Sequence, residues 1–231
     1  RNTFQDLSAN ITIDATTSTA SAGNPNLKPF YADQAEVGVE WYFAEASILS
    51  GSVFVKQLDT FVYTSTQTEI IDGDSLTVTR PNNAKDGADI EGIEVQWQQD
   101  IGMGFGVVTN FTYTDATVPS LSGGQKLSLP GNSKEQMNAS AYYENDQFSV
   151  RLSYNYRSKA FGGLTSGSQL VTDAYSQWDA TANYELNENV KLFFTAVNIT
   201  NEVIHQHTAD GIPVGFYENG QRYSLGARFQ F

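Results

Sequence analysis

The sequence has no cysteine among its 231 residues, and its 13 Lys and Arg are half as many as its 26 Asp and Glu. The missing cysteine excludes a disulfide scaffold and thiolate metal sites. The formal net charge of −13 argues against a nucleic-acid partner, whose phosphates require clusters of Lys and Arg. No window holds the roughly 18 consecutive apolar residues that a membrane-spanning helix needs. These absences leave an acidic chain whose 19 glycines and 13% aromatic residues favour strands over helices.

The first residues, RNTFQDLSAN, contain no apolar stretch of the signal-peptide kind and no initiator methionine. We therefore expect a processed chain or a piece of a longer protein.

Apolar and polar residues alternate with a period of two in much of the chain, which predicts strands with one apolar and one polar face. In the last stretch, QRYSLGARFQF, one parity carries Tyr223, Leu225, Ala227, Phe229 and Phe231. About nine strands are predicted, at residues 35–43, 47–64, 93–98, 105–113, 137–143, 148–156, 177–185, 190–197 and 221–231.

The connections between these strands alternate in length. Short ones are expected at 44–47, 100–102, 144–147 and 186–189, and long polar ones near 65–87, 117–133, 161–173 and 201–219. Short turns at one end and long loops at the other are typical of transmembrane barrels of the outer-membrane type.

Aromatic residues on the apolar parity gather at two levels. Next to the short turns are Trp41, Phe43, Trp97, Phe105, Tyr143, Phe148, Tyr184 and Phe231. About eight residues further along are Phe111, Tyr113, Tyr154, Tyr156, Trp178 and Tyr223, with aliphatic residues between the two levels. Two aromatic girdles around an aliphatic band are what the two interfaces of a bilayer select. A soluble sandwich would instead place its largest rings in mid-strand, so the pattern favours an all-β, antiparallel transmembrane barrel.

Several segments together resemble the β-barrel of TonB-dependent outer-membrane receptors. The stretch GNPNLKPFYADQAEVGVEWYF resembles a long loop of that family entering a strand, although Phe30 stands where the family usually has Glu. The stretches ADIEGIEVQWQQ, 129–158 and FFTAVNITNE resemble later strands and hairpins, and YENGQRYSLGARFQF resembles the last strand. The resemblance covers essentially the whole chain through the order and spacing of these segments.

The resemblance implies a 22-stranded barrel, with short periplasmic turns and long extracellular loops, in the outer membrane of a Gram-negative bacterium. It also implies an N-terminal plug domain, coupling to TonB through a TonB box, and an assembly machinery that reads the terminal strand through Tyr223, Leu225, Phe229 and Phe231. We expect residues 1–231 to be the C-terminal part of this barrel, without the plug, because nine strands would leave open edges in lipid.

The polar residues give no catalytic or cofactor site, and we expect no enzyme activity. His205 and His207 share one face of an extended segment, but without a third ligand they are expected to be polar loop residues. The acidic residues Asp72, Asp74, Asp86 and Asp89 lack the spacing of a calcium loop and are expected to be solvated.

Charged residues on the polar parity are interpreted first as a mixed-charge wall that solvates or braces an interior. The alternative is a ligand path or a plug contact. They are Glu36, Glu40, Glu94, Asp179, Glu185, Arg151, Arg157, Arg222 and Arg228.

The expected function is TonB-energised uptake of a scarce solute, either a ferric siderophore or an oligosaccharide. Its ligand would dock on the loops at 24–34, 65–87, 117–133, 161–173 and 201–219, where Tyr31, Tyr175, Phe216 and Tyr217 are candidate contacts. Lipid would surround the barrel. A passive outer-membrane channel or adhesin barrel remains an alternative, and a secreted soluble carbohydrate-binding β domain is a third.

Overall fold

The computed structural model describes residues 3–118, 127–165 and 168–230, and it is built from strands. Within those residues, no helix is long and apolar enough to cross a membrane. The chain forms two compact units. The first comprises Arg1–Gln34, Lys56–Asp89 and Thr117–Leu127, and the second comprises Ala35–Val55, Ile90–Ala116 and Ser128–Phe231.

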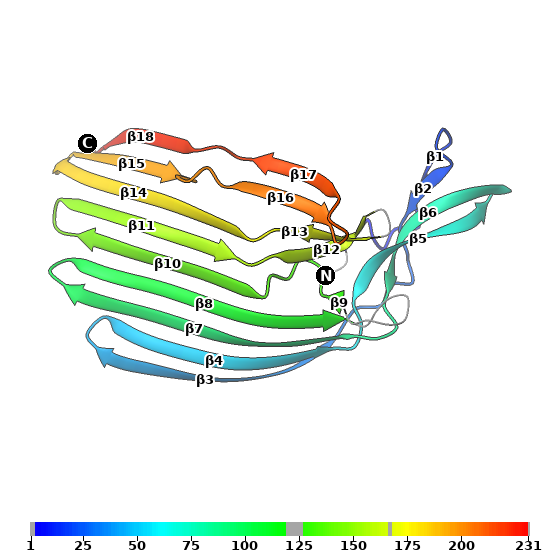
Figure 1. Ribbon diagram of the computed structural model, residues 1–231, viewed down its shortest axis with the longest axis horizontal. Coiled ribbons are helices and arrows are strands. Elements are labelled where there is room, and N and C mark those ends of the chain that lie inside the picture. The colour runs from blue at the N-terminus through cyan, green and yellow to red at the C-terminus, as the bar shows by residue number, and fades with distance from the viewer. Residues whose placement is uncertain (1–2, 119–126, 166–167, 231) are drawn as a thin grey trace. The chain divides into compact units, whose positions relative to one another are not determined.

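The main element of the second unit is a large antiparallel sheet, whose strands follow one another in the order of the sequence. Figure 1 shows these strands side by side in one curved layer, with tight turns at one end. They are β3 (Ala32–Ala44), β4 (Ser47–Leu58), β7 (Ala88–Gly102), β8 (Phe105–Val118), β10 (Glu135–Glu144), β11 (Phe148–Arg157), β14 (Tyr175–Asn187), β15 (Val190–Val197) and β18 (Arg222–Phe229). The short strand β9 (Leu127–Ser128) pairs with β8. The predicted all-β class and nine-strand meander are confirmed.

The tight turns lie where the sequence predicted them, with one exception. The chain turns at residues 45–46, 145–147 and 188–189, as expected from its polar breaks. The turn between β7 and β8 was expected at residues 100–102, and this prediction is wrong because β7 continues to Gly102 and the turn falls at Met103 and Gly104. Gly102, Met103 and Gly104 have φ values of 92°, 55° and 85°, so the left-handed backbone starts at the last predicted residue and continues through the turn.

A second sheet of the same unit lies at the end opposite the tight turns (Figure 1). Its order is β12-β13-β16-β17, and its strands are β12 (Ala160–Thr165), β13 (Ser168–Thr172), β16 (Val203–Thr208) and β17 (Pro213–Glu218). The prediction of long loops at residues 161–173 and 201–219 is therefore wrong in detail, because each segment folds into a hairpin. The two strands of a hairpin satisfy each other's backbone hydrogen-bonding groups, so a hairpin can form without the apolar alternation on which the strand prediction relied.

The first unit contains a small sheet of order β1-β2-β6-β5. Its strands are β1 (Ile11–Asp14), β2 (Thr19–Ala22), β5 (Val62–Ile71) and β6 (Asp74–Asn83). The strand predicted at residues 47–64 is in fact two strands, because β4 ends at Leu58 and β5 begins at Val62. Residues 65–87, predicted as a loop, supply most of the β5–β6 hairpin.

The β5–β6 hairpin closes through a two-residue turn at Asp72 and Gly73, whose φ values are 53° and 96°. Both residues therefore occupy the left-handed region, as a type I′ hairpin turn requires. Of the predicted loop segments, residues 119–126 and 166–167 lie outside the described residues.

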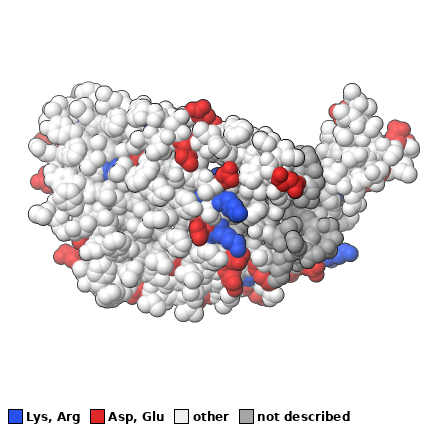
Figure 2. Space-filling view, in the orientation of Figure 1, with Lys and Arg blue, Asp and Glu red and all other residues white. Residues whose placement is uncertain are grey.

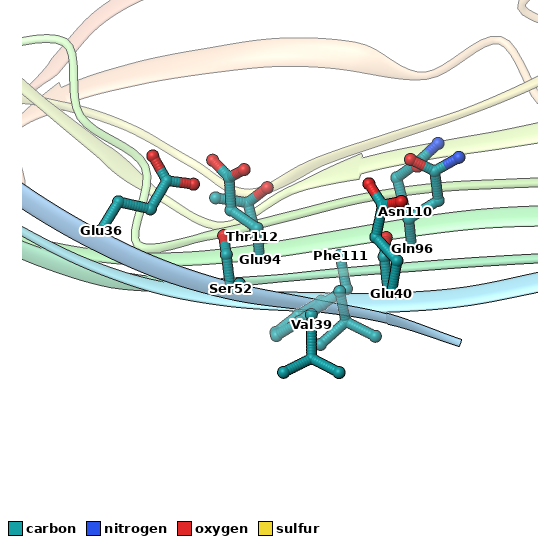
Figure 3. A pocket seen from close by; sticks show the side chains of 13 residues that line it. Glu36, Val39, Glu40, Ser52, Glu94, Gln96, Asn110, Phe111 and Thr112 are labelled. Atoms are coloured by element: carbon teal, nitrogen blue, oxygen red, sulfur yellow. The ribbon is translucent and has the colours of Figure 1, made fainter. Parts of the chain in front are cut away.

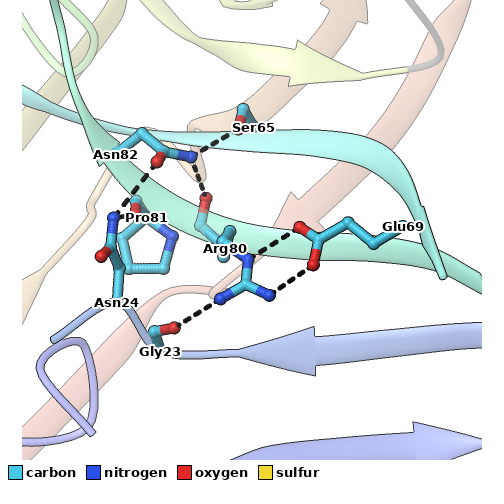
Figure 4. A network of polar contacts seen from close by, with 7 residues as sticks. All are labelled: Gly23, Asn24, Ser65, Glu69, Arg80, Pro81 and Asn82. Carbon is cyan, nitrogen blue, oxygen red and sulfur yellow. Dashed lines mark hydrogen bonds and ion pairs between the residues drawn. The ribbon is translucent and has the colours of Figure 1, made fainter. Parts of the chain in front are cut away.

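The small sheet combines a core of four side chains with a polar network. Ala20, Ala22, Leu76 and Val78 are buried together, and Ile71 packs against them. In the network (Figure 4), the Arg80 guanidinium donates to Glu69 at 2.9 and 2.6 Å and to the Gly23 carbonyl at 3.1 Å.

Candidate functional site

The apolar face of the large sheet is the face formed by the apolar parity of its strands, and much of it is exposed. Val37 and Val39 each expose 70% of their surface and Leu225 exposes 82%. Other large exposed residues of this parity are Trp41, Val53, Val55, Ile93, Val95, Trp97, Phe105, Phe111, Phe148, Leu152, Trp178, Tyr184, Leu192, Phe194, Tyr223 and Phe229. A monomeric soluble protein rarely exposes an apolar surface this extended, and such surfaces mark sites of contact with another protein or with a membrane.

The predicted girdle next to the tight turns forms a contiguous row on four neighbouring strands. Tyr143 lies opposite Phe105, and Phe148 lies opposite Tyr184. The Phe105 and Tyr143 ring centroids are 4.7 Å apart, and those of Tyr143 and Phe148 are 6.4 Å apart.

The same girdle continues on β3 and β7. The Trp41 and Phe43 centroids are 5.4 Å apart on β3, and Trp97 lies on β7 with 39% of its surface exposed. Phe231, the last residue assigned to the girdle and to the terminal strand signal, lies outside the described residues.

A second aromatic level lies nearer the other end of the strands. Tyr154 is opposite Trp178, with ring centroids 4.8 Å apart, and Phe194 stacks on Tyr223 at 6.4 Å. Figure 2 shows one face of the molecule on which few charged side chains appear over the half of the large sheet nearest the tight turns. The geometry fits an apolar band with aromatic margins, the arrangement that a bilayer stabilises.

The polar face of the large sheet is the opposite face, and it carries a hollow of about 510 Å³ over β3, β4, β7 and β8. Figure 3 shows the carboxylates of Glu36, Glu40 and Glu94 on this side, whereas Val39 and Phe111 point to the other. Ser52, Gln96, Asn110 and Thr112 complete the polar lining. The hollow has no Lys or Arg among its lining residues, so a group that fills it would meet carboxylates, amides and hydroxyls.

Basic side chains enter the polar face further along the sheet. The Arg151 guanidinium lies 5.0 Å from the centroid of the Tyr142 ring, and the Arg157 guanidinium lies 5.7 Å from that of Tyr175. Lys191 pairs with Glu185 at 3.0 Å. The polar face thus gathers three carboxylates around the hollow and carries Arg151, Arg157 and Lys191 from β11 onward, a local grouping that the predicted mixed-charge wall did not specify.

A buried turn after β15 fixes one of the predicted wall carboxylates. Asn198 is 2% exposed, has a φ of 55°, and its backbone N–H donates to Asp179 at 2.9 Å. Its side-chain amide donates to the carbonyls of Glu202 and Gly220, and its side-chain oxygen accepts from the Glu202 N–H. Sequence reasoning missed this role of Asn198, although the segment NITN, with asparagines that tolerate left-handed backbone, carried a signal.

The candidate ligand contacts are distributed over both units. In the first unit, Tyr31 is 71% exposed, and its backbone N–H donates to Asp59 at 2.7 Å. In the second, Tyr175 begins β14, and its hydroxyl donates to the Gln177 side chain at 2.7 Å.

Phe216 and Tyr217 are neighbours on β17 and face opposite sides of the hairpin. The Phe216 ring contacts the His205 ring edge-on, with centroids 5.0 Å apart. The Tyr217 ring lies instead beside Gly215, where its atoms come within 3.0 Å of the position a Cβ would take. Both rings expose more than half of their surface. One ligand molecule on one face of β17 would therefore contact one of these rings.

The two histidines of β16 have different partners. His205 packs against Phe216, whereas His207 Nε2 lies 3.2 Å from an oxygen of Asp173. Within the residues that the structure describes, no group of three or more His, Cys, Asp or Glu is placed to hold a metal ion.

The chain matches a family model described as TonB dependent receptor-like, beta-barrel, over residues 1–199. Its fold is similar to a variant of the ferric enterobactin receptor PfeA from Pseudomonas aeruginosa, with a TM-score of 0.66 and 15% identity over 92% of this chain and 33% of that one. The siderophore receptor PirA from Acinetobacter baumannii also has a TM-score of 0.66, at 18% identity over 92% of this chain and 33% of PirA.

The ferric-catecholate import receptor Fiu from E. coli K12 is similar with a TM-score of 0.63 and 19% identity, over 89% of this chain and 28% of Fiu. The chain thus spans about a third of the length of these proteins. At identities this low, the similarity to these structures shows a shared fold alone.

Proposed function

Since this chain belongs to the TonB-dependent receptors, through the β-barrel of that family, we propose that it forms part of the wall of an outer-membrane receptor in a Gram-negative bacterium. The receptor takes up a scarce solute with energy delivered by TonB, and the chain performs no chemical step. The observation that carries this proposal is the nine-strand, single-layer sheet with one exposed apolar face and one polar face. Lipid covers the first face, and the second lines the interior of the barrel.

Three protein partners follow from this proposal. An N-terminal plug domain, outside this chain, occupies the interior and meets the polar face, including the hollow around Glu36, Glu40 and Glu94. TonB acts on that plug. The outer-membrane assembly machinery reads the last strand, where Tyr223, Leu225 and Phe229 share one parity with Phe231.

We propose a ferric siderophore as the solute, because the structural neighbours include a siderophore receptor and a ferric-catecholate import receptor. Tyr31 in the first unit and Tyr175, Phe216 and Tyr217 in the second are proposed ligand contacts, because each offers an aromatic ring or a hydroxyl. An oligosaccharide is the second candidate, favoured by the exposed rings of Phe216 and Tyr217, since aromatic faces pack well against the apolar faces of sugars.

The alternatives differ in a measurable way. A passive channel or adhesin barrel would have the same lipid face but would not need TonB. A secreted soluble carbohydrate-binding domain would have to bury the apolar face, which the described residues leave exposed.

The test is uptake by the whole receptor, expressed in a Gram-negative host that lacks its own siderophore receptors, with and without functional TonB. Radiolabelled iron is supplied as a catecholate or as a hydroxamate complex, and a labelled oligosaccharide is supplied in parallel. The proposal predicts saturable iron uptake that disappears without TonB. If the oligosaccharide alone showed saturable, TonB-dependent uptake, the solute would be an oligosaccharide and not a siderophore. Uptake that does not depend on TonB would overturn the transport mechanism.

A further inference from the structure

His207, on β16, has an oxygen acceptor at each of its two ring nitrogens. Nδ1 lies 2.7 Å from the backbone carbonyl oxygen of Thr208, and Nε2 lies 3.2 Å from Oδ1 of Asp173. A carbonyl oxygen and an ionised carboxylate accept hydrogen bonds and donate none.

A neutral imidazole carries one N–H, so it can satisfy one of these acceptors and must turn a lone pair toward the other. The imidazolium carries two N–H groups and satisfies both. The arrangement around His207 is therefore complementary to the protonated ring.

The contact joins two parts of the second unit that are 34 residues apart. Asp173 follows β13 and stands two residues before Tyr175, where β14 begins. The Asp173 backbone N–H also donates to the His205 carbonyl at 3.0 Å, so side-chain and backbone contacts reinforce each other. β16 pairs with β13 on one side and carries β17 on the other, and β17 is the last strand of its sheet.

The groups around His207 shift its pKa in opposite directions. The Thr208 carbonyl, and after it the Asp173 carboxylate, raise the pKa of His207 above its usual value, whereas burial and the positive charge of Lys159 lower it. His205, the other titratable ring of β16, faces Phe216. The side chains of His207 and Asp173 are 32% and 48% exposed, so solvent weakens their attraction.

We propose that His207 and Asp173 form a proton-dependent latch that holds the β16–β17 hairpin against the segment entering β14. Protonation of His207 closes the latch, and loss of that proton loosens the hairpin. Because the folded pKa lies above the unfolded one, the added stability is complete below the unfolded pKa and is lost as the pH rises through the folded pKa. The latch belongs to the fold and holds whichever solute is carried. Its effect on solute binding through Phe216 and Tyr217 rests on the proposed function.

The test is hydrogen–deuterium exchange of the whole receptor in lipid nanodiscs at about pH 5.5 and about pH 8.5, on either side of the ordinary histidine pKa of about 6.5. Protection factors, corrected for the intrinsic pH dependence of exchange, are compared for peptides covering residues 203–218. The variants are His207→Gln and Asp173→Asn, with His205→Gln as the matched control on the same strand. Peptides from β10 and β11 report whether each variant keeps the barrel wall intact.

The wild type and His205→Gln should lose protection in this hairpin by a few-fold at the higher pH, whereas His207→Gln should show no such loss and Asp173→Asn a smaller one. An unchanged pH response in His207→Gln, or none in the wild type, would overturn the latch. A histidine NMR titration of the wild type keeps the proposal testable if a variant fails to fold. It should place the pKa of His207 above the ordinary value, and a pKa at or below that value would equally refute the proposal.

Discussion

The large sheet and the small β1-β2-β6-β5 sheet use similar strands but differ in what stabilises them. The small sheet buries Ala20, Ala22, Leu76 and Val78 and ties its strands with the Arg80 network. The large sheet has a single layer, and its largest apolar side chains are exposed.

The apolar side chains of the small sheet are covered by one another, whereas those of the large sheet must be covered by what surrounds the sheet. Burial of apolar surface stabilises a sheet at roughly 25 cal/mol per Å², whether protein or lipid covers it. For the large sheet, the covering is proposed to be lipid, so its stability should respond most to changes on the apolar face. The small sheet should respond most to changes in its core and polar contacts.

The largest effect is expected from a charge placed on the apolar face. Ala141 and Asn138 both lie on β10, and Ala141 is on the apolar face opposite Val107 and Leu152, between the two aromatic levels. Ala141→Arg should destabilise the folded receptor by about 2–4 kcal/mol, the cost of a guanidinium near the middle of a bilayer. Guanidinium-induced unfolding from lipid vesicles, followed by the fluorescence of the tryptophans, measures this cost.

Asn138→Arg is the matched control, because Asn138 lies on the polar face opposite Asn110 and Asn155. It should change the free energy of unfolding far less. Equal costs for the two variants would remove the distinction between the faces.

The next effect concerns close packing within the large sheet. Gly92 on β7 lies where an added Cβ would collide with the Phe54 ring and with the Tyr113 carbonyl oxygen at 2.5 Å. Gly92→Ala should therefore force β7 and β8 apart at a cost of about 1–3 kcal/mol, measured by the same unfolding assay. Gly51→Ala is the control, since the nearest atom to its added Cβ is 3.7 Å away. If Gly92→Ala left the free energy of unfolding unchanged, the sheet would tolerate overpacking at this position.

In the small sheet, the Arg80 guanidinium should contribute more to stability than any single apolar contact at the surface. Arg80→Lys removes the two-point contact with Glu69 and the bond to the Gly23 carbonyl. We expect a local destabilisation of about 1 kcal/mol, because the pair is partly exposed. Faster hydrogen exchange of residues 62–83 would show it, with Lys85→Gln as a control and β10–β11 exchange unchanged. Loss of protection in β10–β11 as well would mean that the two sheets are not stabilised separately.

The smallest effect is an acid transition in the turn after β1. The Thr16 backbone N–H donates to Asp14 at 2.9 Å, and this bond, followed by the Thr17 hydroxyl, holds the pKa of Asp14 below its usual value. The contribution is therefore present above the unfolded pKa of about 3.9 and is lost as the pH falls through the folded pKa. An NMR titration of the Thr16 amide should report a midpoint below that of an unfolded peptide. A midpoint at the peptide value would exclude the bond.

The sequence predicted the nine wall strands because one face of each must be apolar and the other polar. That alternation extends through Val37 and Val39 on β3 and through Leu152 and Tyr154 on β11. It could not predict the β5–β6, β12–β13 and β16–β17 hairpins, whose apolar alternation is short, as on β6, where Leu76 and Val78 are the buried pair. The Asp72-Gly73 pair was the one available signal, since this dipeptide favours the type I′ turn that the structure contains.

The contacts of single side chains were beyond sequence reasoning for a different reason. The parallel pairing of β2 with β6 joins segments separated by more than 50 residues, and no local pattern specifies it. The pairing of His207 with Asp173 likewise depends on how two hairpins meet. The gathering of Glu36 and Glu94 around one hollow needed the strand order, because their strands β3 and β7 are both adjacent to β4.

The proposed position in the membrane depends most directly on which face of the large sheet meets lipid. The chain has no cysteine, so single cysteines introduced from Gln136 to Tyr143 on β10, in a receptor cleared of any others, can each carry a spin label. Their accessibility to oxygen in the bilayer and to a water-soluble nickel complex is then measured in nanodiscs. Accessibility should alternate, with labels at 137, 139, 141 and 143 accessible to oxygen and the intervening labels accessible to the nickel complex. Uniform accessibility, or lipid contact at the intervening positions, would contradict the proposed position.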